Sequence, residues 1–105
     1  GDKMLQRTGQ DLAIKLEAKT AGLQAASLRL AYQPDKARTS PTVTLNGQAL
    51  PVPDLASYAT GSLSSLVIPV PTALVKAQNA VQFNGPPSGG MLGAVLLHAS
   101  YLTTE

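Results

Sequence analysis

Hydrophobic and polar residues alternate along most of this chain. In residues 11–19, DLAIKLEAK, the apolar positions Leu12, Ile14 and Leu16 are separated by single small or charged residues. The same period of two recurs in three later segments, residues 27–33, 63–70 and 79–84. Such alternation is typical of strands with one buried face, because successive side chains point to opposite sides of a sheet. The pattern therefore predicts strands, although Ala, Leu, Glu and Lys in the first segment would also suit a helix.

A hairpin signal lies in the middle of the chain. A polar loop with a proline at each end, residues 34–41, leads into the β-branched strand of residues 42–45. This strand ends at Asn46-Gly47, and both residues tolerate the positive φ that a two-residue type I′ turn requires. The predicted return strand, residues 48–53, contains two prolines and is therefore confined to the edge of a sheet.

The remaining segments complete an all-β pattern. We predict loops over residues 54–62 and 85–90, a short helical turn over residues 71–77 and a last strand over residues 91–103. In that last strand Val95, Leu97, Ala99 and Tyr101 share one face. With no long helix, the chain is predicted to be an antiparallel β-sandwich or jelly roll of about seven to eight strands. Its length suits a single domain, residues 1–105.

Composition refines this picture. Hydrophobic residues make up 44% of the chain, which is enough for a packed core and argues against disorder. Charged residues make up only 13%, a low share that favours a secreted or periplasmic β-protein. The first residues contain no apolar signal-peptide core. Because the chain starts with Gly and not with Met, we expect it to be a domain excised from a longer protein.

The charge pattern and the apolar runs limit the possible partners. The net formal charge is +2, from eight Lys and Arg and six Asp and Glu, and only Lys36 and Arg38 lie close together among the basic residues. Nucleic acid is bound by clusters of Lys and Arg, so we expect no nucleic-acid partner. We also expect no membrane partner, because no run of about 18 apolar residues exists. The chain has no cysteine, which excludes disulfides and thiolate metal sites.

Residues suited to catalysis are few. His98 is the single histidine, and no nucleophile motif accompanies it. Asp35 and Asp54 fall in different loops, and nothing in their neighbourhoods pairs them as the two carboxylates of a glycosidase. We therefore predict no enzymatic activity, no catalytic residue and no cofactor. Structural calcium remains an alternative, with Asp11, Asp35 and Asp54 as its only reasonable ligands.

Tyrosines next to polar loops are the candidates for ligand binding. The chain has no Trp, and Tyr32 borders the loop that carries Asp35 and Arg38. Tyr58 lies within the predicted loop of residues 54–62. A tyrosine ring can stack on the apolar face of a sugar while nearby charged groups bind its hydroxyls. We therefore predict a ligand site at Tyr32, Asp35, Arg38 and Tyr58, with ordinary loop residues as the alternative interpretation.

Four segments fit the pattern of a known family. The hairpin supplies Val43, Leu45, Asn46 and Gly47. Residues 66–83 match at Ile68, Pro69, Val70, Pro71, Leu74, Lys76, Asn79, Val81 and Phe83. Together with residues 26–36 and 93–101, these segments resemble the galactose-binding-like jelly-roll modules of polysaccharide-active proteins. The likeness extends over residues 26–101 and implies an accessory domain of an agarase-like enzyme.

This resemblance implies two functions. The first is a non-catalytic carbohydrate-binding module of a secreted polysaccharide-processing protein, whose weak contacts would gain from tethering to an enzyme. The alternative is a structural sandwich that packs on its parent catalytic domain, or on another protein, without binding sugar. Exposed apolar residues such as Leu96 and Leu102 would then form the interface. The partner is accordingly a polysaccharide or a parent catalytic domain.

Overall fold

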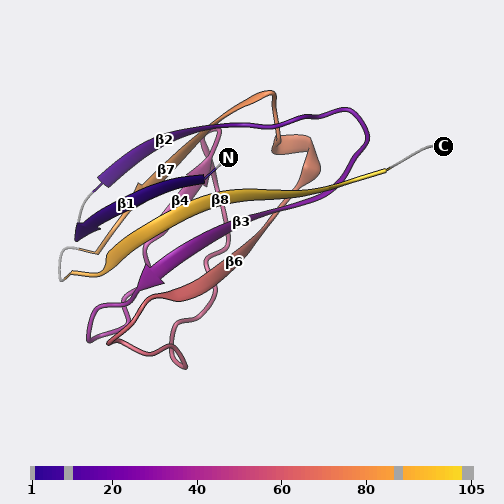
Figure 1. Cartoon of the computed structure of the whole chain (residues 1–105). Coiled ribbons are helices and arrows are strands. Elements are labelled where there is room, and N and C mark those ends of the chain that lie inside the picture. The colour runs from indigo at the N-terminus through magenta and orange to yellow at the C-terminus, as the bar shows by residue number, and fades with distance from the viewer. Residues whose placement is uncertain (1, 9–10, 87–88, 103–105) are drawn as a thin grey trace.

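The chain folds into two antiparallel sheets stacked face to face (Figure 1). The computed structural model describes residues 2–8, 11–86 and 89–102, and only the backbone of residues 2–8. In chain order its elements are β1 (Asp2–Thr8), β2 (Asp11–Glu17), β3 (Leu23–Gln33), β4 (Thr42–Leu45), β5 (Gln48–Ala49), β6 (Ser64–Val70), the 3₁₀ helix η1 (Thr72–Leu74), β7 (Gln78–Asn84) and β8 (Met91–Tyr101). The prediction of an all-β sandwich is confirmed.

The order of the strands is that of a jelly roll. One sheet, the front sheet, has the order β1-β8-β3-β6, and the other, the back sheet, has the order β2-β7-β4-β5. The antiparallel pairs β1·β8, β2·β7, β3·β6 and β4·β5 are nested inside one another. The chain is thus one long hairpin rolled across two sheets. The turn between β4 and β5 is the tip of that hairpin.

Burial along the strands follows the predicted period of two. On β2, Ile14 and Leu16 are buried, whereas Lys15 and Glu17 are exposed. The strands β3, β6 and β7 show the same alternation over most of their length. A helix over residues 11–19 would instead bury positions three and four apart, so the strand interpretation of this segment is confirmed.

Side chains from the two inner faces form one hydrophobic core. Burying a Val, Leu, Ile or Phe side chain contributes about 1.5–3 kcal/mol, so these contacts are what hold the sheets together. The buried apolar residues are Ile14, Leu16, Leu28, Leu30, Tyr32, Val43, Leu45, Leu50, Leu55, Leu66, Ile68, Val70, Val75, Val81, Phe83, Leu92, Val95 and Leu97.

The tip of the hairpin forms the predicted type of turn. Asn46 has a φ of 51° and Gly47 a φ of 85°, as a type I′ turn requires. The side chain of Asn46 donates through Nδ2 to the carbonyl oxygen of Leu74 at 2.7 Å. Its Oδ1 accepts from the backbone N–H of Ala80 at 2.8 Å. The turn is therefore fastened both to β7 and to the segment between β6 and β7.

A buried amide, Asn79, continues this network into the back sheet. Asn79 is only 1% exposed. Its Oδ1 accepts from Asn46 Nδ2 at 3.1 Å and from the backbone N–H of Lys76 at 2.8 Å. Its Nδ2 donates to the carbonyl oxygens of Leu16 at 3.2 Å and Lys76 at 2.8 Å. Because both polar atoms of the amide are satisfied, the cost of burying it is offset.

Several element boundaries differ from the sequence prediction. The strand β1 was not predicted, because its sequence DKMLQRT shows no alternation. The strand β3 begins at Leu23, four residues earlier than expected. The return strand β5 ends at Ala49, since Pro51 and Pro53 break the ladder beyond it. The predicted helical turn is the short helix η1. Thr103, the predicted end of the last strand, lies outside the described residues.

A β-bulge at Gly93 interrupts the last strand. The pairing with β3 passes from Ala31 opposite Ala94 to Tyr32 opposite Leu92, which leaves Gly93 as an extra residue of β8. The register toward β1 shifts at the same place, but there the extra residue belongs to β1. Leu92 therefore joins the buried face, although alternation counted back from Val95 would have placed it outside. The side chain of Leu63 covers the bulge, where a Cβ on Gly93 would lie 2.9 Å from Leu63 Cδ1.

Candidate functional site

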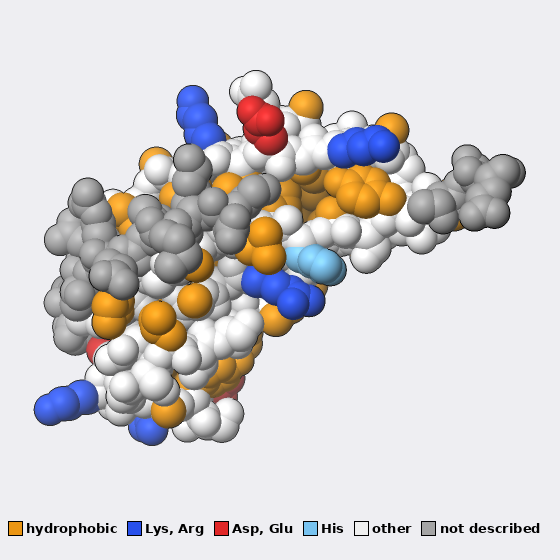
Figure 2. Space-filling view, viewed as in Figure 1, with side chains coloured by type: hydrophobic (Ala, Val, Ile, Leu, Met, Phe, Trp, Pro, Cys, Tyr) orange, Lys and Arg blue, Asp and Glu red, His pale blue; other side chains and the backbone are white. Residues whose placement is uncertain are grey.

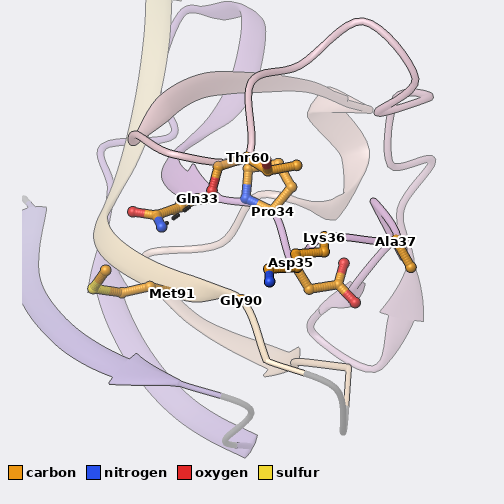
Figure 3. Close-up of a pocket in the computed structure, with 8 residues that line it drawn as sticks. All are labelled: Gln33, Pro34, Asp35, Lys36, Ala37, Thr60, Gly90 and Met91. Carbon is orange, nitrogen blue, oxygen red and sulfur yellow. Dashed lines mark hydrogen bonds between the residues drawn. The ribbon is translucent and has the colours of Figure 1, made fainter.

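Three connections between strands meet at one end of the sandwich, which we call the loop end. They are the β3–β4, β5–β6 and β7–β8 connections (Figure 1). A cavity of about 510 Å³ lies among them. It is lined by Gln33, Pro34, Asp35, Lys36, Ala37, Thr60, Gly90 and Met91 (Figure 3).

The strand ends that enter the loop end supply one wall of this cavity. Gln33 is the last residue of β3, and Met91 is the first residue of β8 (Figure 3). Gln33 Nε2 donates to the carbonyl oxygen of Thr60 at 3.2 Å, which ties the β5–β6 connection to β3. Pro34 and Met91 contribute apolar surface to the same space.

Asp35 organises the β3–β4 connection. The residue is 7% exposed, and its Oδ1 accepts from the backbone N–H of Thr39 at 2.7 Å. Its Oδ2 accepts from the Thr39 hydroxyl at 3.0 Å, and its carbonyl oxygen accepts from the backbone N–H of Arg38 at 3.0 Å. The carboxylate, which was predicted to bind a ligand, thus holds its own loop in shape.

Arg38 connects two of the loops. Its φ of 54° is unusual for a residue other than glycine. Its exposed side chain donates through Nε to the carbonyl oxygen of Tyr58 at 2.7 Å. The structure therefore brings Arg38 and Tyr58 together, as the predicted site required, but through the backbone of Tyr58. The ring of Tyr58 is partly buried and packs against the core.

Tyr32 is in the core, and the expectation that its ring is available for stacking on a sugar is wrong. The residue is 0% exposed, and its ring meets that of Phe83 edge to face, with centroids 5.8 Å apart. Its hydroxyl is buried next to Gly90 and has no hydrogen-bond partner among the residues that the structure describes. Burial, and secondly the negative charge of Asp35, raise the pKa of this hydroxyl to about 12.

Of the eight described residues that line the cavity, Asp35 alone was a predicted site residue. Gln33, Lys36, Thr60 and Met91 were not predicted, because their roles depend on which loops the fold brings together. Two signals were present in the sequence. The loop of residues 34–41 is bracketed by prolines, and residues 85–90 read GPPSGG. Both mark irregular connections, and such connections carry binding residues more often than strands do.

The groups at the loop-end cavity are an amide, a hydroxyl, a carboxylate, an ammonium group and apolar surface. His98 lies elsewhere, exposed on the front sheet and paired in register with Ser27. Within the described residues no three His, Cys, Asp or Glu side chains are grouped to hold a metal ion. Of the three calcium ligands considered, Asp54 accepts from the backbone N–H of Ala56 at 3.0 Å within its own loop.

The outer face of the front sheet is a second surface of interest. Figure 2 views this face, where the histidine and a basic side chain lie beside hydrophobic side chains. A groove of about 350 Å³ is lined by Arg29, Leu30, Ala31, Leu63, Ser64, Ser65, Ala94 and Leu96. Leu63 is 47% and Val67 45% exposed. Leu96, predicted to be an exposed interface residue, is partly buried, whereas Leu102 is 58% exposed.

No known protein-family model matches this sequence, and no curated protein is significantly similar to it. Among the described residues, no helix has the length and apolar character needed to cross a membrane.

Proposed function

We propose that this domain is a non-catalytic carbohydrate-binding module of a secreted polysaccharide-processing protein, with its binding site at the loop end. The composition of the loop-end cavity carries the proposal. The apolar side chains of Pro34 and Met91 border the same space as the amide of Gln33 and the ammonium group of Lys36. A sugar ring offers an apolar face and a rim of hydroxyls, and such a mixture of groups complements both.

Two further observations support this function. Residues 26–101 resemble galactose-binding-like modules, and the jelly-roll strand order is compatible with that resemblance. Fold alone does not decide function, so the proposal rests on the cavity. Since Tyr32 is buried, Tyr58 is the one tyrosine of the predicted set with exposed surface, and Arg38 holds its backbone in place.

Affinity electrophoresis tests the proposal directly. The domain is run through native gels that contain agarose, alginate, xylan, β-glucan or pectin. We expect one polymer to retard the wild-type domain and Lys36→Ala and Met91→Ala to reduce that retardation. Lys15→Ala is the matched control, because Lys15 is exposed on the back sheet and its loss changes the net charge by the same amount as the loss of Lys36.

The outcomes distinguish whether the domain binds a polysaccharide from where on the domain it binds. Retardation that Lys36→Ala and Lys15→Ala leave equally intact would contradict a site at the cavity. Retardation lost only in Tyr58→Ala would move the site toward the β5–β6 connection. If no polymer retarded the domain, the carbohydrate-binding function would be wrong.

A second function, packing on a catalytic domain or another protein without binding sugar, is favoured by the front sheet. Large apolar side chains such as Leu63 and Val67 are half exposed there beside a groove. Apolar surface of this kind is a feature of protein interfaces. This function predicts no retardation by any polymer. It also predicts that Val67→Lys increases solubility, measured by precipitation with ammonium sulfate, because the substitution removes exposed apolar surface.

A further inference from the structure

The sequence Asn-Gly occurs twice in this chain, as Asn46-Gly47 and Asn84-Gly85. This dipeptide is prone to spontaneous loss of ammonia from the asparagine side chain, because glycine leaves its backbone nitrogen sterically open. The third asparagine, Asn79, precedes an alanine. The two dipeptides are alike in sequence, so any difference in their reactivity within the folded protein must come from the structure.

The reaction needs no partner other than water. The backbone nitrogen of the glycine attacks Cγ of the asparagine and forms a new carbon–nitrogen bond. The bond from Cγ to the side-chain nitrogen breaks, and ammonia leaves. Water then opens the resulting succinimide at either of its two carbonyl carbons, giving aspartate or isoaspartate. Nothing is oxidised or reduced, and the product carries one additional negative charge.

The fold holds the side chain of Asn46 away from this reaction. Its Nδ2 donates to the carbonyl oxygen of Leu74 at 2.7 Å and to Asn79 Oδ1 at 3.1 Å. Its Oδ1 accepts from the backbone N–H of Ala80 at 2.8 Å. The amide must leave all three hydrogen bonds before its carbon can turn toward the nitrogen of Gly47. The reaction at Asn46 therefore requires local opening of the fold.

Asn84 is in the opposite situation. It is exposed and is the last residue of β7, so that Gly85 already lies outside the strand. The hydrogen bond of its side chain comes from Gln82 Nε2, at 2.9 Å, and is itself exposed to solvent. A hydrogen bond that is open to solvent restrains the amide weakly. The amide of Asn84 is therefore much freer to rotate than that of Asn46.

We propose that Asn84-Gly85 is a site of spontaneous deamidation and isoaspartate formation in the folded protein, whereas Asn46-Gly47 reacts only when the fold opens. Each modified molecule changes its net formal charge from +2 to +1, since 8 − 7 = 1. The new carboxylate lies in register with Asp11 of the neighbouring strand. Isoaspartate also adds a methylene to the backbone where β7 enters the loop end. This inference is independent of the proposed sugar binding.

Peptide mapping by mass spectrometry measures both sites in one experiment. Trypsin cuts after Arg38 and Lys76, which places Asn46 and Asn84 in different peptides. The protein is incubated in mildly alkaline native buffer and, in parallel, in concentrated urea. We expect Asn84 to react at least about tenfold faster than Asn46 in native buffer, because local opening limits the slower site. In urea we expect the two rates to converge.

Two variants distinguish the chemistry from the structural protection. Gly85→Ala should slow the reaction at Asn84 in both buffers and leave Asn46 unchanged, and Gly85 has no positive φ that would strain an alanine. Asn79→Ala removes one acceptor from Asn46 and should accelerate Asn46 in native buffer. The proposal is overturned if Asn46 reacts as fast as Asn84 in native wild type. It is equally overturned if Asn84 reacts no faster than Asn79, or if Gly85→Ala leaves the rate at Asn84 unchanged.

Discussion

At the scale of single residues, Asn46 has two roles that substitutions can separate. It adopts a φ of 51°, and its side chain makes three hydrogen bonds. Asn46→Gly keeps the turn conformation but loses these bonds, and we expect it to cost about 1–3 kcal/mol of unfolding free energy. Asn46→Ala loses the same bonds and adds about 1–2 kcal/mol of left-handed strain. Urea unfolding of the two variants measures both contributions.

Gly47→Ala provides the matched control for this prediction. Gly47 has a φ of 85°, and no atom of the described residues beyond its chain neighbours lies within 4 Å of the position that a Cβ would occupy. The substitution therefore adds backbone strain without a clash or a lost hydrogen bond. If Asn46→Gly were as stable as wild type, the amide network would contribute nothing to stability.

The buried hydroxyl of Tyr32 predicts an unusual sign for a core substitution. It has no hydrogen-bond partner within the described part of the chain, so Tyr32→Phe removes an unsatisfied polar group and should stabilise the protein by about 1 kcal/mol. Tyr101→Phe is the control, because the Tyr101 hydroxyl donates to the carbonyl oxygen of Lys19 at 2.7 Å. That variant should lose about 0.5–1.5 kcal/mol. Equal losses for both variants in urea unfolding would contradict the prediction.

The same hydroxyl makes stability depend on alkaline pH. Its pKa is raised from 10.0 to about 12 in the folded protein, by burial first and by the charge of Asp35 second. Below pH 10 the hydroxyl is protonated in both states. As pH rises from 10 to 12, the unfolded chain releases the proton more readily than the folded protein. The free energy of unfolding therefore falls by up to about 2–3 kcal/mol over this range. The free energy of unfolding of wild type and of Tyr32→Phe, measured across this pH range, isolates the contribution of the hydroxyl. Two parallel curves would contradict the prediction.

At the scale of elements, the bulge in β8 predicts a coupling between two residues. A Cβ on Gly93 would lie 2.9 Å from Leu63 Cδ1, on a side chain that is 47% exposed. Gly93→Ala must therefore push Leu63 aside, and we expect a cost of about 1 kcal/mol. In a Leu63→Ala background this cost should largely disappear. A double-mutant cycle by urea unfolding measures the coupling, and additive effects would contradict it.

Prediction from sequence succeeded where burial is a local property and failed where it depends on distant partners. The alternation of Leu28, Leu30 and Tyr32 placed all three on one face, and that face is the buried one. The prediction that Tyr32 binds a ligand relied on its position beside a loop, whereas the alternation already placed its side chain on the buried face. The bulge at Gly93 could not be predicted, because it exists only in relation to the pairing of β8 with β3.

The loop end shows the same limit. The composition of residues 34–41 indicated an irregular connection, but nothing local revealed that Thr60 and Met91 would face it across a cavity. These residues come together only because the jelly roll returns its connections to one end. The Asn46-Gly47 turn was predictable because two adjacent residues determine its conformation. Its hydrogen bond to Asn79 was not predictable, because Asn79 lies 33 residues away.

At the scale of the whole molecule, the nested strand order predicts how protection from hydrogen exchange is distributed. The strands β3 and β8 lie inside the front sheet with a neighbour on each side, and β3 is central to the core. The strand β5 is a two-residue edge strand, and Gln48 and Ala49 are both exposed. Central, buried strands open only with the whole fold, whereas short edges open locally.

We therefore expect amides of β3 and of β8 beyond the bulge to exchange slowest and those of β5 to exchange fastest among the strands. Native-state hydrogen exchange followed by NMR measures this order residue by residue. The turn between β4 and β5 gives the sharpest test of this order of exchange. The backbone N–H of Asn46 donates to the carbonyl oxygen of Ala80 at 2.8 Å, so it should be protected although Gln48 beside it is not. Equal exchange at Asn46 and Gln48 would mean that the amide network opens together with the sheet edge, and does not anchor the tip of the rolled hairpin.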